Sequence, residues 1–157
     1  MEPMTPTAIF GQMTALADPT RSRLLLALER NELTVNELRS ILQLPQSTIS
    51  RHLKMLSAEG WVEARAEGTS RHYRIATDSL DPASRRLWHL VRDEVMHTTA
   101  ADQDARRTQA VLAERLAGRR VLALTMHAIV GELEGIELVG EDAEAVLIGG
   151  ADETPES

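Results

Sequence analysis

The stretch Leu44–Gly60, LPQSTISRHLKMLSAEG, determines how this chain folds. Its apolar residues Ile49, Leu53 and Leu56 recur at helical spacing and fall on one face, so the stretch predicts an amphipathic helix. The proline at its second position suits a helix start, where the missing N–H is not needed. The glycine that closes the stretch suits a helix end.

The opposite face of this helix is polar, and no acid appears in it before Glu59. It carries Gln46, Ser47, Ser50, Arg51 and Lys54. Gln and Ser near a helix N-terminus can reach base edges in the major groove of DNA, while Arg and Lys further along meet phosphates. An ordinary surface helix with a solvated polar face fits the same pattern. The neighbouring segments are therefore needed to distinguish the two interpretations.

A capped helix and a tight turn precede this stretch. Thr34-Val35-Asn36-Glu37 has the pattern of a capping box and opens a short helix through Ile41 and Leu42. Only Gln43–Pro45 separates that helix from the next. Two helices joined by so short a turn indicate a helix-turn-helix, with an ordinary helical hairpin as the alternative.

Two further helices are expected upstream. The first runs over Ala8–Ala17, and Asp18-Pro19 starts the second, with Asp as its cap and Pro in the first helical position. Leu24, Leu25 and Leu28 form the buried stripe of this second helix.

Downstream, the period changes to that of a β-hairpin. Trp61–Ala66 and Arg71–Ala76 read as strands around a turn that contains Gly68. A hairpin directly behind the second helix of such a pair is a wing. Arg65, Arg71 and Arg74 lie on it, where they serve either solubility or contact with a DNA backbone or minor groove.

Asp81-Pro82 starts another helix, whose broad apolar face extends to about Met96. A face of that width needs a partner, and the first helix is the candidate, within the chain or across a dimer. His89, Asp93 and His97 follow at intervals of four on this helix. That spacing suits a metal site, but surface residues of an amphipathic helix are the favoured interpretation.

The rest of the chain carries no recognised motif. Residues 101–120 read as a helix, with a boundary at Gly118 and Arg119-Arg120. Residues 121–131 read as a short helix, Ile136–Val139 and Ala145–Ile148 as strands, and the final ADETPES as a disordered acidic tail. We therefore expect a winged domain over 1–100, a helical extension or linker over 101–120, and an acidic segment of unknown role over 121–157.

The net charge of -7 is unusual for a DNA-binding protein, but it is unevenly distributed. Residues 1–79 carry nine Lys/Arg and nine Asp/Glu, residues 80–120 carry eight and six, and residues 121–157 carry none and nine. The acidity therefore lies in the last segment, and the local field at the contact face is what matters for DNA.

Composition also narrows the possible functions. With 0 cysteines, the chain has no disulfide, thiolate metal site or thiol redox sensor, which fits a reducing cytoplasm. There is no apolar run of membrane-spanning length, Gly-rich phosphate loop or nucleophile elbow. The sequence thus predicts a cytoplasmic protein that is not an enzyme, with no cofactor, metal or membrane partner.

Three segments together resemble the ArsR/SmtB family of winged helix-turn-helix repressors. They are ALADPTRSRLLLAL, ELTVNELRSILQLPQSTISRHLKMLSAEGWV and EGTSRHYRI, which lie within residues 8–76. The resemblance implies a mainly α fold with a small β-hairpin, flanking dimerisation helices and a short C-terminal appendage. It also implies a homodimer that represses a promoter until a signal lowers its affinity for DNA.

On this resemblance, the recognition helix and the wing bind double-stranded DNA. The residues expected to do so are Gln46, Ser47, Thr48, Ser50, Arg51, His52, Lys54, Arg65 and Arg71. Two symmetric recognition helices one duplex turn apart, about 34 Å, predict a palindromic operator.

The sequence departs from the family pattern at the sensor. Many members carry a metal-binding cysteine in the third helix, where this chain has Asn36 in ELTVNEL. Sensing by thiols is therefore excluded for this chain, and a small-molecule effector remains open. The zinc or nickel ligands of the last helix are also poorly matched.

Two other interpretations of the sequence remain. A winged helix can serve protein contacts instead, although the polar recognition face favours DNA, because a protein interface tends to present aromatic or aliphatic anchors. The helix after the wing and residues 101–120 also look like the linker of ArsR-type regulators fused to an S-adenosylmethionine-binding methyltransferase. The chain would then be a shortened relative of such a fusion.

Overall fold

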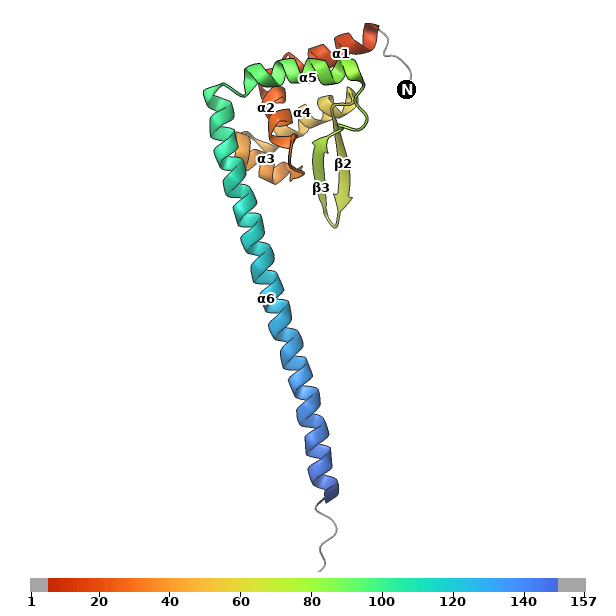
Figure 1. The fold of residues 1–157 in the computed structure, drawn as a ribbon, viewed down its shortest axis with the longest axis vertical. Coiled ribbons are helices and arrows are strands. Elements are labelled where there is room, and N and C mark those ends of the chain that lie inside the picture. The colour runs from red at the N-terminus through yellow and green to blue at the C-terminus, as the bar shows by residue number, and fades with distance from the viewer. Residues whose placement is uncertain (1–5, 150–157) are drawn as a thin grey trace, which may run out of the picture. The chain divides into compact units, whose positions relative to one another are not determined.

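The computed structural model describes residues 6–149, which group into two compact units divided between Leu112 and Ala113. The helices are α1 (Pro6–Leu16), α2 (Pro19–Leu28), α3 (Val35–Leu42), α4 (Gln46–Ala58), α5 (Pro82–Val95) and α6 (Thr99–Gly149) (Figure 1). The strands are β1 (Leu33–Thr34), β2 (Val62–Glu67) and β3 (Ser70–Ile75). The first unit is a winged helix-turn-helix, as predicted.

Side-chain caps fix where the helices begin. The Asp18 carboxylate accepts hydrogen bonds from two backbone N–H groups at the start of α2, and Asp81 does the same for α5. Thr34 and Glu37 form the predicted capping box of α3. These bonds satisfy backbone donors that have no partner within the helix.

The core of the first unit lies among α2, α3, α4 and the base of the wing. Leu24, Leu25 and Leu28 are buried as predicted, and so are the three apolar residues of α4. Trp61 is fully buried where α4 meets β2, and its indole N–H donates to the Gln12 carbonyl at 3.3 Å. This bond ties α1 to the segment between α4 and β2.

The wing contains one strand more than the sequence predicted. β2 and β3 pair in the expected antiparallel register, with Val62 opposite Ile75, and β1 adds to the outer edge of β3. β1 has only two residues, too short to show an alternating pattern in sequence. It joins the start of α3 to the wing through Leu33, which is fully buried.

The last helices pack against the winged core. α5 contacts α1 and α2, and Trp88 is buried with its indole N–H donated to Glu29. Arg23 of α2 makes two hydrogen bonds to Asp104 of α6, at 2.6 and 2.8 Å, and Asp104 is only 5% exposed. This ion pair anchors the start of α6.

The second unit differs from the prediction. α6 continues through Gly118 without a break and extends to Gly149, so the strands expected at Ile136–Val139 and Ala145–Ile148 are wrong. Short apolar runs do not distinguish a strand from a helix by periodicity. The predicted tail, residues 151–157, lies outside the described residues.

We expect Asp104→Ala to lower the free energy of unfolding by about 2–3 kcal/mol, because it leaves the partly buried Arg23 guanidinium without its carboxylate. Asp102→Ala is the matched control, since its pair with Arg106 is exposed and should contribute at most about 0.5 kcal/mol. Urea unfolding followed by tryptophan fluorescence measures both. Equal losses in the two variants would contradict the anchoring role of Asp104.

Candidate nucleic-acid interface

The helix-turn-helix is built by α3, a sharp turn and α4. Gln43 ends α3 in the left-handed conformation, with φ 57°, and its backbone N–H donates to the Arg39 carbonyl. Pro45 then sets the start of α4, and no side chain caps this helix. The backbone N–H of Thr48 donates to the Pro45 carbonyl, so those of Gln46 and Ser47 remain available to an anion such as a phosphate.

α4 is divided lengthwise into a buried side and an exposed side. Ile49, Leu53 and Leu56 are at most 1% exposed. The exposed side carries Gln46, Ser47, Ser50, Arg51 and Lys54, as the sequence predicted. Thr48 and His52 are half-buried at its border, and Met55, whose exposure the sequence pattern did not indicate, is 45% exposed.

The exposed side of α4 carries two cations, Arg51 and Lys54. Within the described residues, neither Arg51 nor Lys54 makes an ion pair. Glu59 lies at the far end of the helix, beyond its last residue, Ala58. Two exposed cations beside hydroxyl and carboxamide groups can bind phosphates and base edges together.

The arginines of the wing fall into two groups. Arg65 pairs with Glu32 at 2.7 Å and with Glu67 at 2.9 Å, and Arg74 pairs with Glu63 across the hairpin. Arg71 is exposed and has no ion pair among the residues that the structure describes. Of the two wing residues predicted to bind DNA, Arg71 is therefore free to do so, whereas Arg65 must exchange carboxylates for phosphates.

The possible metal ligands of α5 do not come together. His89 and Asp93 are exposed, Asp93 accepts hydrogen bonds from Arg92, and His97 lies beyond the end of the helix at Val95. No group of three or more His, Cys, Asp or Glu residues in the described part of the chain could hold a metal ion. No helix of residues 6–149 is both long and apolar enough to cross a membrane.

Comparison with known proteins shows which family the chain belongs to. The profile of the bacterial regulatory protein, arsR family, matches residues 18–64, which run from the cap of α2 into β2. The transcriptional regulator CmtR of Mycobacterium bovis is 36% identical over 122 residues, covering 78% of this chain and 94% of CmtR. The chain belongs to the ArsR family. The names of this family and of CmtR are those of regulators, not of enzymes.

Other similarities cover less of the chain. The transcriptional repressor SmtB of Mycobacterium tuberculosis is 37% identical over 93 residues, which is 59% of this chain and 62% of SmtB. The match thus spans about three fifths of the length of that relative. Among solved structures, HlyU from Vibrio cholerae has a TM-score of 0.49 and 30% identity, covering 56% of this chain and 91% of that one.

His52 gives the interface a pH-sensitive group. Burial, together with the nearby charges of Arg21 and Arg51, lowers the pKa of the His52 imidazole below its ordinary 6.5, although Asp18 opposes the shift. The imidazole is therefore neutral at pH 7. It adds a hydrogen-bonding group to the border of α4, but no charge.

We expect the stability of the fold to fall as the pH drops through about 6.5, because the unfolded chain then takes up a proton that folded His52 does not. The stability that neutral His52 contributes is fully present above that pH. It is lost as the pH falls toward the pKa of His52 in the folded protein. Urea unfolding at a series of pH values between about 5 and 8, on the native chain and on His52→Gln, tests this. An identical pH dependence in both proteins would refute the assignment to His52.

Proposed function

We propose that the chain is a homodimeric DNA-binding repressor of transcription that reads a palindromic operator with α4 and the wing. The observation that carries the proposal is the exposed side of α4, which is polar and free of acids and bears Arg51 and Lys54, neither of which makes an ion pair with a described residue. The name of mycobacterial SmtB, a transcriptional repressor, supports the direction of regulation. A DNA-reading role implies the cytoplasm as the compartment.

Each group on this surface has a distinct role in the proposal. Gln46, Ser47 and Ser50, in the first turns of α4, read base edges, with Thr48 and His52 at the border. Arg51 and Lys54 bind phosphates, and so does Arg71 on the wing. Arg65 contributes only after releasing Glu32 and Glu67, and therefore less.

The dimer is inferred from apolar side chains that the single chain leaves exposed. Phe10 and Met13 of α1 are 64% and 46% exposed, and Leu90 of α5 is 67% exposed. α1 and α5 pack on each other, so these side chains lie on two neighbouring helices. Large apolar side chains exposed on neighbouring helices are typical of an interaction site. A two-fold axis here would present two recognition helices to successive turns of the duplex.

The signal that releases the DNA is not a thiol reaction, since the chain has 0 cysteines. A small-molecule effector requires no thiol, and it is the class of signal that we propose. Its binding would have to favour a conformation with lower affinity for DNA.

Arg51→Ala and Arg71→Ala test the DNA contacts, with Arg74→Ala as the matched control on the same strand as Arg71. We expect the first two to weaken binding and to reduce the slope of log affinity against log salt by about two, one phosphate contact per protomer. Arg74, held by Glu63, should have little effect. Fluorescence anisotropy on a duplex selected from a random pool measures the slopes, and circular dichroism checks the fold. Unchanged slopes for both variants would rule out phosphate contact by these side chains.

Leu90→Glu tests the dimer, because it places a charge on the proposed apolar interface. We expect a monomer in sedimentation velocity and a loss of operator binding of at least tenfold, since one recognition helix binds half a site. Gln103→Glu, which adds the same charge at an exposed polar position of α6, should leave the dimer intact. A dimeric Leu90→Glu protein would mean that the interface lies elsewhere.

A further inference from the structure

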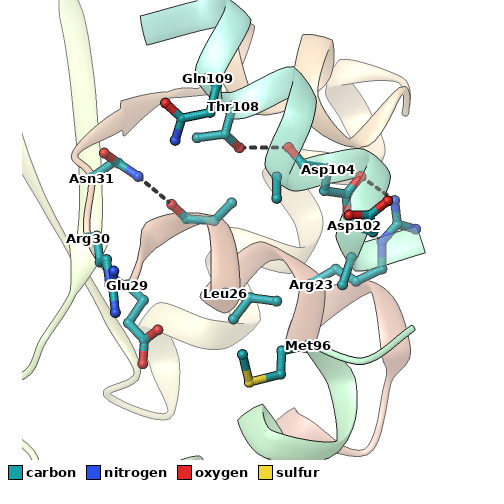
Figure 2. Close-up of a pocket in the computed structure, with 13 residues that line it drawn as sticks. Arg23, Leu26, Glu29, Arg30, Asn31, Met96, Asp102, Asp104, Thr108 and Gln109 are labelled. Atoms are coloured by element: carbon teal, nitrogen blue, oxygen red, sulfur yellow. Dashed lines mark hydrogen bonds and ion pairs between the residues drawn. The ribbon is translucent and has the colours of Figure 1, made fainter. Parts of the chain in front are cut away.

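A cavity of about 350 Å³ lies between α2 and the first turns of α6, and none of the residues predicted to bind DNA lines it. The end of α2 and residues 29–31 form one wall, α6 from Ala101 to Gln109 forms another, and Met96 closes it from the turn after α5 (Figure 2). Its size is at the lower end of the range for small-molecule sites, about 300–1,000 Å³. All of its lining residues belong to the first unit.

The cavity has a buried floor and an open rim. Ala27, Ala101 and Thr108 are at most 8% exposed and form part of the floor. Met96 is 48% exposed, and Leu26 is half-buried beside it (Figure 2). Apolar surface is thus left in contact with solvent within a concave site, which is the usual setting for the apolar part of a small ligand.

The charges in the lining are matched, with one exception. Asp104 is paired with Arg23, Glu29 with Arg92, and Asp102 with Arg106. Arg30 is exposed at the rim, and no hydrogen bond or ion pair joins it to another described residue. The lining therefore presents one guanidinium, that of Arg30, which pairs with no carboxylate in the part of the chain that the structure describes.

Two carboxamides complete the polar lining. The Asn31 amide donates to the Ala27 carbonyl at 3.4 Å, which leaves its oxygen without a partner among the described residues. Gln109 is exposed at the opposite wall, where Figure 2 shows it across the cavity from Leu26 and Met96. These groups can hydrogen-bond a ligand without adding charge.

We propose that this cavity binds a small organic monocarboxylate, with its carboxylate on Arg30 and its apolar body on Leu26 and Met96. A planar carboxylate matches the two parallel N–H donors of a guanidinium. A dianion such as phosphate fits less well, because three carboxylates already lie in the lining and only one of its cations lacks an ion pair with a described residue. The site thus selects for a single negative charge joined to an apolar group.

The effect of a ligand in this cavity can be transmitted to α4 through one chain of contacts. Asp104 in the cavity wall also accepts a hydrogen bond from Arg107, and Arg107 donates to the Ile41 carbonyl at the end of α3, at 3.2 Å. α3 leads directly into the turn before α4. A ligand that separates α6 from α2 would loosen this support of the helix-turn-helix, so it would act as the effector; this last step rests on the proposed function.

The binding test uses the full chain and does not involve DNA. Isothermal titration calorimetry with benzoate, phenylacetate and hexanoate should give saturable binding of at least one, and the corresponding amide should not bind. Arg30→Gln should weaken binding by at least about tenfold, while Arg120→Gln, which removes the same charge outside the cavity, should not. Ala105→Phe should also abolish binding, because it fills the cavity from an exposed position on α6.

Several results would overturn the site. The first is that none of the three carboxylates binds saturably up to about 10 mM. The second is that the native chain and Arg30→Gln bind a carboxylate with equal affinity. The third is that Ala105→Phe binds it as tightly as the native chain does. Circular dichroism of each variant confirms that a loss of binding is not a loss of fold.

A second measurement separates the site from the proposed function. The carboxylate that binds should lower operator affinity by at least about fivefold in the native chain and not in Arg30→Gln. Carboxylate binding with unchanged operator affinity would retain the cavity site and refute its regulatory role. Failure to bind any duplex would refute the repressor proposal and leave the calorimetric result standing.

Discussion

The fold depends on one requirement, that α4 bury its apolar stripe while leaving its other side open. Ile49 and Leu56 are fully buried, and Leu53 is 1% exposed. At about 1.5–3 kcal/mol for a fully buried aliphatic side chain, this stripe is a large share of the stability of a small domain. α2 and α3 pack against the buried side, so the exposed side bears no packing role and its residues are free to serve recognition.

Ion pairing divides the cations into those that stabilise the fold and those that are available to bind a ligand. Arg23 pairs with Asp104 of α6, and Arg92 of α5 pairs with Glu29 at the end of α2, so these two pairs support α6 and α5. Arg74 pairs with Glu63 across the two strands of the wing. The hydrogen bond to Asp104 raises the pKa of Arg23 further above its already high value. Arg51, Lys54 and Arg71 have no such partner in the part of the chain that the structure describes. The same type of charge therefore supports the fold in one place and remains available for ligands in another.

Most of the winged domain could be predicted from the sequence, because its signals are local. The Asp18 and Thr34 caps, the helical spacing of the α4 stripe and the turn at Gly68 each act within a few residues. The exposure of Arg51 followed from the same spacing. β1 could not be predicted, since two residues show no period, and neither could the helix in place of the strands expected within α6, where short apolar runs suited both structures.

Pairings between residues far apart in the chain could not be predicted from the sequence, for a different reason. Arg23 and Asp104 are 81 residues apart, and nothing in the pattern of either helix indicates that they meet. Their pairing nevertheless determines which of the neighbouring cations stays free: Asp104 is used by Arg23 and Arg107, so it is not available to Arg30. The cavity and the support of α3 thus share one carboxylate. A chain without sensor thiols can still link an occupied site to its recognition helix if the ligand and the helix-turn-helix compete for the placement of α6.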